Sequence, residues 1–239
     1  MNFQETLKIF IGYDKREAVA YHTCVQSILD NTTIPVSITP LNLKMFKNYK
    51  EKHTDGSNDF IYTRFLIPYL SSFNGIGLFI DGDMIVQEDL SKLLSLFDKK
   101  YAVQVVKHNY KKKFKTKYLG SKNDDYPRKN WSSVILFNCN HKSNSILTPE
   151  FISRSPGSYL HRFSWLKDSE IGELPKKWNH LVHEYDVDHD ASINHYTLGT
   201  PCFEEFNYGI ESEMWHKYFS NSLEGFDYKY NTKKNSSRI

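Results

Sequence analysis

The sequence contains few residues that could cross-link the chain or anchor it. Its 239 residues include three cysteines, Cys24, Cys139 and Cys202, an odd number without a CxxC pair. This spacing argues against a disulfide framework and against a zinc-thiolate site. No apolar run approaches the roughly 18 residues of a membrane-spanning helix, and residues 1–10 lack the regions of a secretory signal. We therefore expect a soluble protein in a reducing, cytoplasmic setting.

Charge of one sign is not in excess either. Lys and Arg number 31 and Asp and Glu 28, so the formal net charge is +3 and no nucleic-acid partner is called for. Basic residues cluster in one segment, residues 107–117 (KHNYKKKFKTK). We interpret this segment as a solvated loop, with a lid or acceptor-facing loop that attracts phosphate as the alternative.

The glycine-rich motifs that cradle phosphates are also missing. There is no GxGxxG after the first predicted strand and no GxxxxGK[ST] anywhere in the chain. A diphosphate bound to this protein would therefore depend on a metal ion and on arginine and lysine side chains.

The hydrophobic pattern predicts an α/β fold that opens with a βαβ unit. Residues 8–14 (KIFIGYD) and 35–43 have the composition of buried strands. The segment between them carries an apolar stripe at helical spacing, formed by Ala18, Tyr21, Val25, Ile28 and Leu29. A strand, a helix and a strand within about 35 residues indicate two neighbouring parallel strands.

Later segments extend the same pattern. Further strands are predicted at residues 77–80, 101–107 and 133–139, and Asp89 can cap a helix that starts at Leu90. We expect residues 1–225 to form a single domain and the polar residues 226–239 to be a disordered tail.

Two carboxylates follow the predicted strand at residues 77–80. The segment GLFIDGDMIV places Asp81 and Asp83 at the strand end, where side chains two apart point to the same side. Two carboxylates there are costly to desolvate unless a cation lies between them, and their oxygens suit Mg²⁺ or Mn²⁺. Ligands of open α/β sheets bind beyond the carboxyl ends of strands, so a nucleotide is expected here. The alternative is a surface turn with solvated acids.

In order, these segments resemble the GT-A glycosyltransferases, and most closely the retaining family 8 group that includes glycogenin and bacterial galactosyltransferases. The resemblance runs from about residue 8 to residue 203, through IFIGYD, YTRFLIPYL, LFIDGDMIV, WSSVILFN, WLKDSEIGELP and INHYTLGTPCF. It implies an α/β GT-A (Rossmann-like) fold with a central, mostly parallel sheet flanked by helices. It also implies transfer of a hexose, with retention, from a nucleotide-sugar to a hydroxyl of a carbohydrate or glycoconjugate. UDP-glucose and UDP-galactose are the favoured donors.

The resemblance further implies a metal site formed by Asp81, Asp83 and His195, with Mn²⁺ or Mg²⁺ as the ion. Only His195 matches the family motif among the histidines near it in sequence, which also include His180, His183 and His189.

Other residues would contact the donor. Arg64 would reach its phosphate or sugar, with an ion pair to a structural carboxylate as the alternative. Asp168 would lie under the reacting sugar carbon, a role for which Glu170 competes. The remaining donor contacts implied by the resemblance are Ile11, Gly12, Tyr13, Asp14, Gly82, Trp131, Ser132 and Gly199.

The chain departs from the family pattern at several of these positions. Trp131 replaces the usual asparagine, and the glutamine that normally follows the aspartate at position 168 is absent. In residues 195–203 the glycine of His-x-x-Gly-x-x-Lys-Pro-Trp is shifted by one, to Gly199, and the phosphate-binding lysine is missing. A metal ion or another cation would then carry more of the diphosphate charge. These departures indicate a divergent branch.

Other functional classes stay open at this point. A sugar nucleotidyltransferase would share the fold and the use of a metal, but its glycine-rich phosphate loop is absent. A phosphatase of the haloacid dehalogenase type normally has threonine where this chain has Ile85. A non-catalytic nucleotide-sugar-binding protein would bind the donor without turnover.

Overall fold

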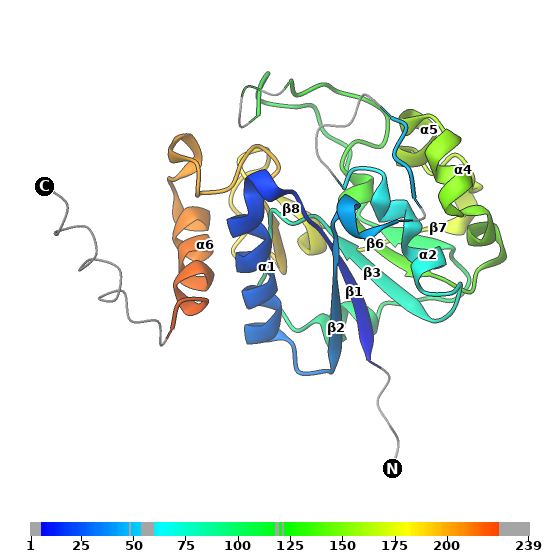
Figure 1. Cartoon of the computed structure of the whole chain (residues 1–239). Helices are drawn as coiled ribbons and strands as arrows, with labels where there is room; N and C mark the ends of the chain where they lie inside the picture. Colours follow the sequence, from blue (N-terminus) through cyan, green and yellow to red (C-terminus); the bar gives the residue numbers. More distant parts are fainter. Residues whose placement is uncertain (1–5, 48, 54–59, 118–119, 121, 225–239) are drawn as a thin grey trace, which may run out of the picture.

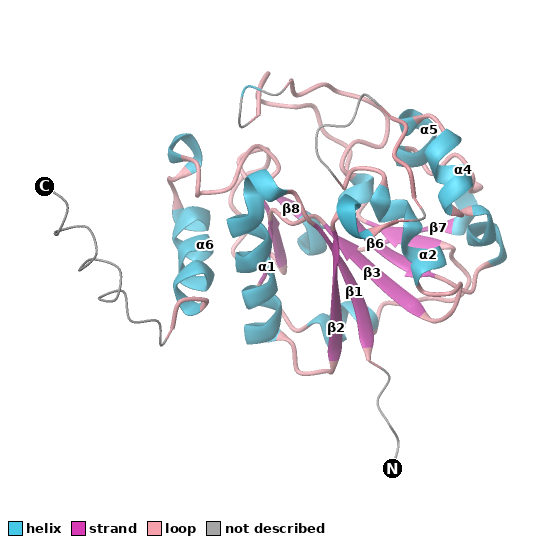
Figure 2. Ribbon diagram, viewed as in Figure 1, coloured by secondary structure: helices cyan, strands magenta, loops and turns pink. Residues whose placement is uncertain are grey.

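The computed structural model describes residues 6–47, 49–53, 60–117, 120 and 122–224. A central sheet runs through the molecule with helices on both sides (Figures 1 and 2). The predicted tail, residues 226–239, lies outside the described residues, and the single-domain assignment of residues 1–225 stays a prediction.

Six strands form the central sheet, in the order β2-β1-β3-β6-β5-β7. The βαβ prediction is confirmed, because β1 pairs in parallel with β2, and β1 also pairs in parallel with β3. The strand β6 runs antiparallel to both neighbours, which makes the sheet mixed. The strands are β1 Leu7–Gly12, β2 Val36–Leu41, β3 Ile76–Ile80, β5 Val103–Val105, β6 Val134–Asn138 and β7 Ile171–Glu173.

Alternating side chains of the strands fill a core on each face of this sheet. Ile9 and Ile11 of β1 pack with the helix α1 (Ala18–Asn31) on one face. Phe10, between them, packs on the other face. That second face is covered by the short helices α2 (Ile67–Leu70), α4 (Pro149–Arg154) and α5 (Gly157–His161). The alternation is the two-residue period expected of strands buried on both sides.

Fewer of the apolar residues of α1 face the sheet than the apolar stripe in its sequence predicts. Tyr21 and Ile28 are buried as expected, whereas Leu29 is 56% exposed. One residue corresponds to about 100° around a helix, so Leu29 faces away from the sheet when Ile28 faces it. The buried positions include the small residues Ala20, Cys24 and Ser27, which bring the helix close to the sheet.

A second, three-stranded sheet lies beside the first, in the order β4-β9-β8. Its strands are β4 Met84–Val86, β9 Ile193–His195 and β8 His180–Leu181. In the antiparallel pair β4–β9, Met84 lies opposite His195. The helix α6 (Ile210–Asn221) packs against α1 and buries Trp215 and Tyr218 near this sheet. The pairing of β4 with β9 brings the segment that follows β3 next to residues 193–195, more than 100 residues later in the chain.

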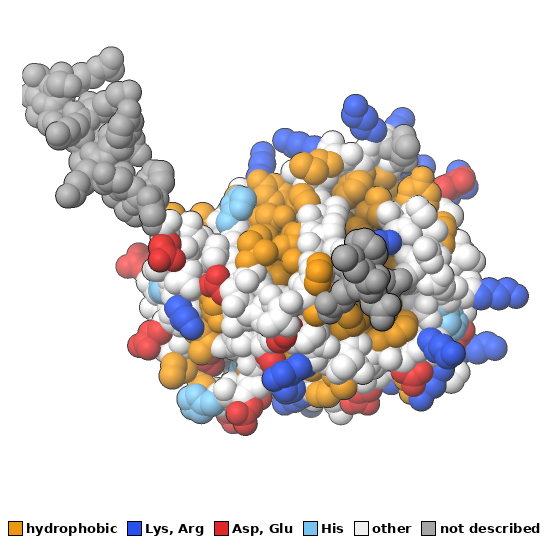
Figure 3. All heavy atoms as spheres, turned by 90° about the horizontal axis from the view of Figure 1, so that it is seen from below, with side chains coloured by type: hydrophobic (Ala, Val, Ile, Leu, Met, Phe, Trp, Pro, Cys, Tyr) orange, Lys and Arg blue, Asp and Glu red, His pale blue; other side chains and the backbone are white. Residues whose placement is uncertain are grey.

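The short helix α3 (Leu90–Leu94) follows β4 and has the predicted cap. Asp89 accepts a hydrogen bond from the Ser91 amide at 2.9 Å. Among the described helices, none has both the length and the apolarity needed to cross a bilayer. Figure 3 shows the face at the amino end of β1, where hydrophobic side chains gather centrally and charges of both signs lie around them.

Candidate functional site

A cavity of about 340 Å³ opens beyond the carboxyl ends of β1 and β3. Its size is within the range of small-molecule sites. Gly12 ends β1 at its edge, Asp81 follows β3, and His195 reaches it from β9. The far wall comes from α5 and from residues before η3, the 3₁₀ helix Thr63–Leu66. The cavity therefore lies where the sequence predicts the nucleotide, at the carboxyl edge of the sheet.

The structure brings most of the predicted site residues to this cavity, but not all of them. Those that line it are Gly12, Asp14, Arg64, Asp81, Gly82, Asp83, Ser132 and His195. Those outside its lining are Ile11, Tyr13, Trp131, Asp168 and Gly199.

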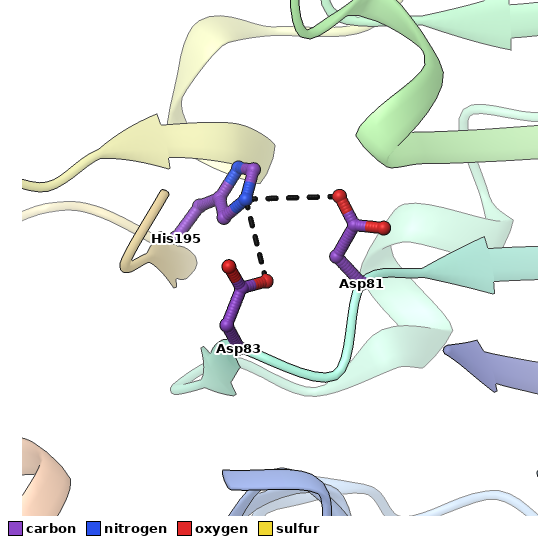
Figure 4. Close-up of side chains that lie close together, drawn as sticks. All are labelled: Asp81, Asp83 and His195. Atoms are coloured by element: carbon purple, nitrogen blue, oxygen red, sulfur yellow. Dashed lines mark ion pairs between the residues drawn. The ribbon is translucent and has the colours of Figure 1, made fainter. Parts of the chain in front are cut away.

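Asp81, Asp83 and His195 form a compact cluster in the cavity. His195 Nε2 lies 3.7 Å from Asp81 Oδ2 and 3.4 Å from Asp83 Oδ1, and the histidine points from β9 toward both carboxylates (Figure 4). One ligand atom from each residue lies within 4.8 Å of the others. The histidine comes from a distant part of the chain because β9 pairs with β4.

A tight turn between β3 and β4, rather than the strand period, makes the two carboxylates converge. Asp81 lies just after β3, and Gly82 and Asp83 form the turn into β4. A Cβ atom on Gly82 would clash with the carbonyl oxygen of Gly12, so the turn packs directly against the end of β1. The two acids lie on one side, as expected, but a turn rather than the strand period brings them there, because the chain passes from the first sheet to the second between them.

Asn179 orients the imidazole of His195. The Asn179 Oδ1 atom lies 3.0 Å from His195 Nδ1, and Asn179 itself is fully buried. An amide oxygen can only accept, so Nδ1 carries a proton and Nε2 is the ring nitrogen that faces the cavity. The Asn179 amide nitrogen donates in turn to Ser133 Oγ at 2.8 Å.

Arg64 is a buried residue of the cavity lining, and it contacts both Asp81 after β3 and Ser132 before β6. Its Nη2 lies 3.0 Å from Asp81 Oδ1, and its Nη1 donates to the Ser132 carbonyl at 2.7 Å. The guanidinium carbon lies 4.6 Å from the centre of the Phe79 ring, a cation–π contact. Arg64 thus pairs with a carboxylate, as the alternative interpretation has it, but that carboxylate belongs to the candidate metal site.

Burial and neighbouring charges shift the pKa values of Asp81 and Asp83 in opposite directions. Burial raises the pKa of Asp81 to about 6, against the opposing effect of Arg64. Burial acts in the same direction on Asp83, but His195 and Lys117 outweigh it and lower the pKa of that carboxyl. One of the two acids is therefore easier to ionise than the other.

The residues of this cluster fit a divalent cation. Asp81 Oδ1 and Asp83 Oδ1 are buried; the first meets Arg64 Nη2 at 3.0 Å, and the second has no hydrogen-bond donor among the residues that the structure describes. Such atoms are costly to bury unless a cation or a donor meets them. Two carboxylates and a neutral imidazole are a ligand set that Mn²⁺ accepts readily and that Mg²⁺ accepts less readily.

Asp168 and Trp131 lie away from the cavity. The Asp168 side chain is 86% exposed and forms an ion pair with Arg128 at 2.6 Å. Trp131 is half-buried against the core, outside the cavity lining, and donates from Nε1 to the His108 carbonyl at 2.8 Å. Its neighbour Ser132 faces the cavity, with its hydroxyl 2.7 Å from His161 Nδ1.

The other three predicted contacts are outside the cavity lining for simpler reasons. The Ile11 side chain is fully buried in the core, as the strand alternation requires. Tyr13 packs edge-on against Tyr21 of α1, with 5.3 Å between the ring centres. Gly199 is held in a buried turn by its hydrogen bond to the Tyr196 carbonyl.

Comparison with known proteins assigns this arrangement to a family. The family model described as glycosyl transferase family 8 matches residues 7–154, which include the two carboxylates. Protein CDI of Arabidopsis thaliana is 39% identical over 221 residues, covering 89% of this chain and 85% of that protein. The chain belongs to glycosyl transferase family 8. It is therefore a glycosyltransferase, and the family resemblance predicted from its motifs is confirmed.

Solved structures share the fold of this family 8 glycosyltransferase. The apo form of the glycosyltransferase GlyE of Streptococcus pneumoniae TIGR4 superposes with a TM-score of 0.60 at 16% identity, over 92% of this chain. The chain spans 62% of that protein's length. The galactosyltransferase LgtC, solved with donor and acceptor sugar analogues, gives a TM-score of 0.56 at 11% identity, covering 90% of this chain and 96% of LgtC. The predicted GT-A fold is confirmed.

Several residues at this glycosyltransferase's site escape prediction from the sequence, among them one asparagine and two lysines. Asn179 lies in an irregular polar stretch, and nothing in its neighbourhood indicates a contact with His195. Lys117 and Lys129 line the cavity from the region between β5 and β6. The basic composition of residues 107–117 was the one available signal for Lys117, and it did not distinguish this lysine from its neighbours.

Proposed function

We propose that this family 8 enzyme uses a divalent metal ion, Mn²⁺ or Mg²⁺, to transfer a hexose from a UDP-sugar to a carbohydrate hydroxyl. The observation that carries the proposal is the buried cluster of Asp81, Asp83 and His195 at the carboxyl edge of the sheet. Its buried carboxylates converge on one point, and Asp83 Oδ1 has no hydrogen-bond donor among the described residues, so the cluster is suited to a cation. The cavity in front of it is of a size that accepts a small ligand.

Within this proposal, each residue at the cavity has a defined task. Asp81, Asp83 and His195 hold the metal, which when bound neutralises charge on the diphosphate. Arg64 keeps Asp81 in place and carries positive charge close to the donor. Gly12 and Gly82 allow the turn after β3 and the side chain of Phe60 to pack closely at the edge of the cavity, while Asp14 and Ser132 offer polar atoms to the donor.

The donor and the stereochemistry are proposed from family membership. Family 8 resemblance favours UDP-galactose or UDP-glucose and retention at the anomeric carbon. LgtC is a galactosyltransferase, and the fold that it shares with this chain supports a galactose donor here. We assign no part in bond breaking to Asp168, whose carboxylate pairs with Arg128 at the surface. An inverted linkage in the product, measured by NMR, would contradict the proposed retention.

Isothermal calorimetry tests the metal and nucleotide site directly. We expect UDP to bind the wild-type protein in the presence of Mn²⁺ and to lose at least about tenfold in affinity without it. The Asp83→Ala variant should lose the metal-dependent part of binding. The matched control is Asp188→Ala, which alters an exposed Asp-x-Asp motif and should bind UDP as the wild type does.

The outcomes separate the proposal from its alternatives. Binding of equal strength without metal, or no binding of UDP, would contradict the proposed site. A sugar nucleotidyltransferase would release pyrophosphate from a sugar phosphate and UTP, whereas the proposed enzyme releases UDP. UDP-sugar binding with no hydrolysis or transfer to any screened acceptor would favour a non-catalytic binding protein.

A further inference from the structure

Three lysines of a segment that has no assigned part in the reaction line the cavity, and one of them, Lys122, is 81% exposed and paired with Asp124. Lys117 and Lys129 both line the cavity that contains Asp81, Asp83 and His195. They belong to the region between β5 and β6, which includes the basic run at residues 107–117. Most charges in such runs are solvated, so the folding of these two into the cavity needs an explanation.

Buried Asn123 folds this region inward. It donates from Nδ2 to the Phe114 carbonyl at 2.9 Å and to Glu184 Oε1 at 3.1 Å. An antiparallel bridge between Thr116 and Lys122 closes the segment just after this contact. Described residues next to this bridge line the cavity, including Lys117 and Asn123.

Lys117 is held next to the candidate metal ligands. Its ammonium group donates to Thr197 Oγ1 at 3.1 Å, two residues beyond His195. The side chain is half-buried, and burial lowers the pKa of Lys117 while Asp83 and Asp81 oppose that shift. Within the described part of the chain, this ammonium has no carboxylate oxygen within 4.0 Å and makes one hydrogen bond, to a neutral hydroxyl.

Lys129 is buried more deeply, with 7% of its side chain exposed. Its ammonium donates to Asn123 Oδ1 at 2.6 Å and lies 3.9 Å from the Asp125 carboxylate. An ammonium has three donors, and partly desolvated cations are stable only where acceptors or anions meet them. The two lysines therefore give one side of the cavity an excess of donors.

We propose that Lys117, supported by the positive charge of Lys129, contacts the β-phosphate of the donor diphosphate beside the metal site. The inference rests on the proposed function and adds a binding residue to it. The chain has neither a glycine-rich phosphate loop nor a lysine in residues 195–203. Lys117 supplies positive charge from another part of the chain, and its hydrogen bond to Thr197 places its ammonium group beside the segment that follows His195. No covalent step is involved.

Calorimetry on three variants tests this assignment, with UDP, UMP and Mn²⁺ as separate ligands. Lys117→Met should weaken UDP binding in Mn²⁺ by about tenfold or more, the usual effect of losing a charge-assisted bond to phosphate. UMP has no β-phosphate, so its affinity should change by less than about twofold. Lys117→Arg retains the charge and should stay within about threefold of the wild type. The control Lys115→Met removes an exposed lysine of the same run and should leave UDP binding unchanged.

Each outcome decides the matter. Unchanged UDP affinity in Lys117→Met, with normal binding by the wild type, overturns the role of Lys117 and leaves the proposed function intact. Equal losses for UDP, UMP and Mn²⁺ alone would indicate a structural role and also overturn it. Absence of UDP binding by the wild-type protein would instead contradict the proposed function, and this inference would fall with it.

Discussion

At the scale of single residues, the buried pair Asn179 and His195 governs how the imidazole faces the cavity. The hydrogen bond from His195 Nδ1 to Asn179 Oδ1 selects the tautomer whose Nε2 can bind a metal. Asn179 is itself fixed by its donation to Ser133 Oγ. A residue that touches neither metal nor donor can therefore control metal affinity through the orientation of a ligand.

Replacing Asn179 by alanine should weaken Mn²⁺ binding by about 10- to 100-fold, the usual effect of removing the partner of a metal-bound histidine. Titration of Mn²⁺ followed by electron paramagnetic resonance measures the change. Asn144→Ala is the matched control, because Asn144 is equally buried but bonds backbone carbonyls in the sheet. Loss of stability without loss of metal affinity is expected there. Equal Mn²⁺ affinities for Asn179→Ala and the wild type would show that the hydrogen bond does not orient the ligand.

At the scale of elements, Glu88 joins three segments that surround the second sheet. Its carboxylate accepts hydrogen bonds from Lys92 and Lys177, each at 2.7 Å, and from Ser192 at 2.5 Å. These partners lie in α3, in the 3₁₀ helix η8 (Lys176–Asn179) and next to β9. The hydrogen bonds from Lys177, Lys92 and Ser192 lower the pKa of Glu88 to about 2. The connection between β4 and β9 thus includes an ion-pair network as well as backbone pairing.

The free energy of unfolding should depend on pH through this carboxyl. Its pKa in the folded protein lies below the value of about 4.3 in an unfolded chain, so Glu88 stabilises the fold above about pH 4.5. That contribution is lost as the pH falls through about 2. We expect Glu88→Gln to cost about 1–2 kcal/mol at pH 7, after allowance for solvent screening, and less at pH 2–3. Urea unfolding across this pH range measures the difference.

The control for this prediction is Glu150→Gln. Glu150 forms only an exposed pair with Arg154 in the described structure, at 2.9 Å, so its loss should cost under about 0.5 kcal/mol at any pH. A constant difference between Glu88→Gln and the wild type from pH 7 to pH 2 would contradict the expected titration.

At the scale of the whole molecule, the candidate metal site ties together distant parts of the chain. Asp81 and Asp83 follow the third strand, whereas His195 lies near the end of the described residues. The three side chains meet only when β4 pairs with β9. A metal held by all three should therefore bind the folded state and not the unfolded one.

Mn²⁺ at about 100 times its Kd should raise the free energy of unfolding by roughly 2.7 kcal/mol. For a protein of this length the corresponding rise in Tm is roughly 5–10 °C. Thermal unfolding in Mn²⁺ and in EDTA measures it, and the rise should disappear in His195→Ala. The control His189→Ala changes an exposed histidine of the same region and should keep the rise. An equal metal-induced rise in His195→Ala would exclude His195 as a ligand.

Local sequence was enough to predict much of this fold. The βαβ opening, the strand before the carboxylates and the Asp89 cap all depend on near neighbours, through hydrophobic period and capping preference. The pair Asp81 and Asp83 was recognisable for the same reason, because a buried strand directly precedes it. The motifs in order also identified the family, since they preserve local chemistry along most of the chain.

The sequence by itself thus determined the class of the fold, the family and the two carboxylates, because short-range patterns encode them. Tertiary structure alone decided how His195 reaches those carboxylates and which asparagine and lysines stand beside them. His195 arrives through the β4–β9 register, Asn179 through its buried hydrogen bond, and Lys117 through a contact with Thr197. It also left Asp168 at the surface, paired with Arg128. These placements depend on contacts between distant segments, whose geometry no local pattern records.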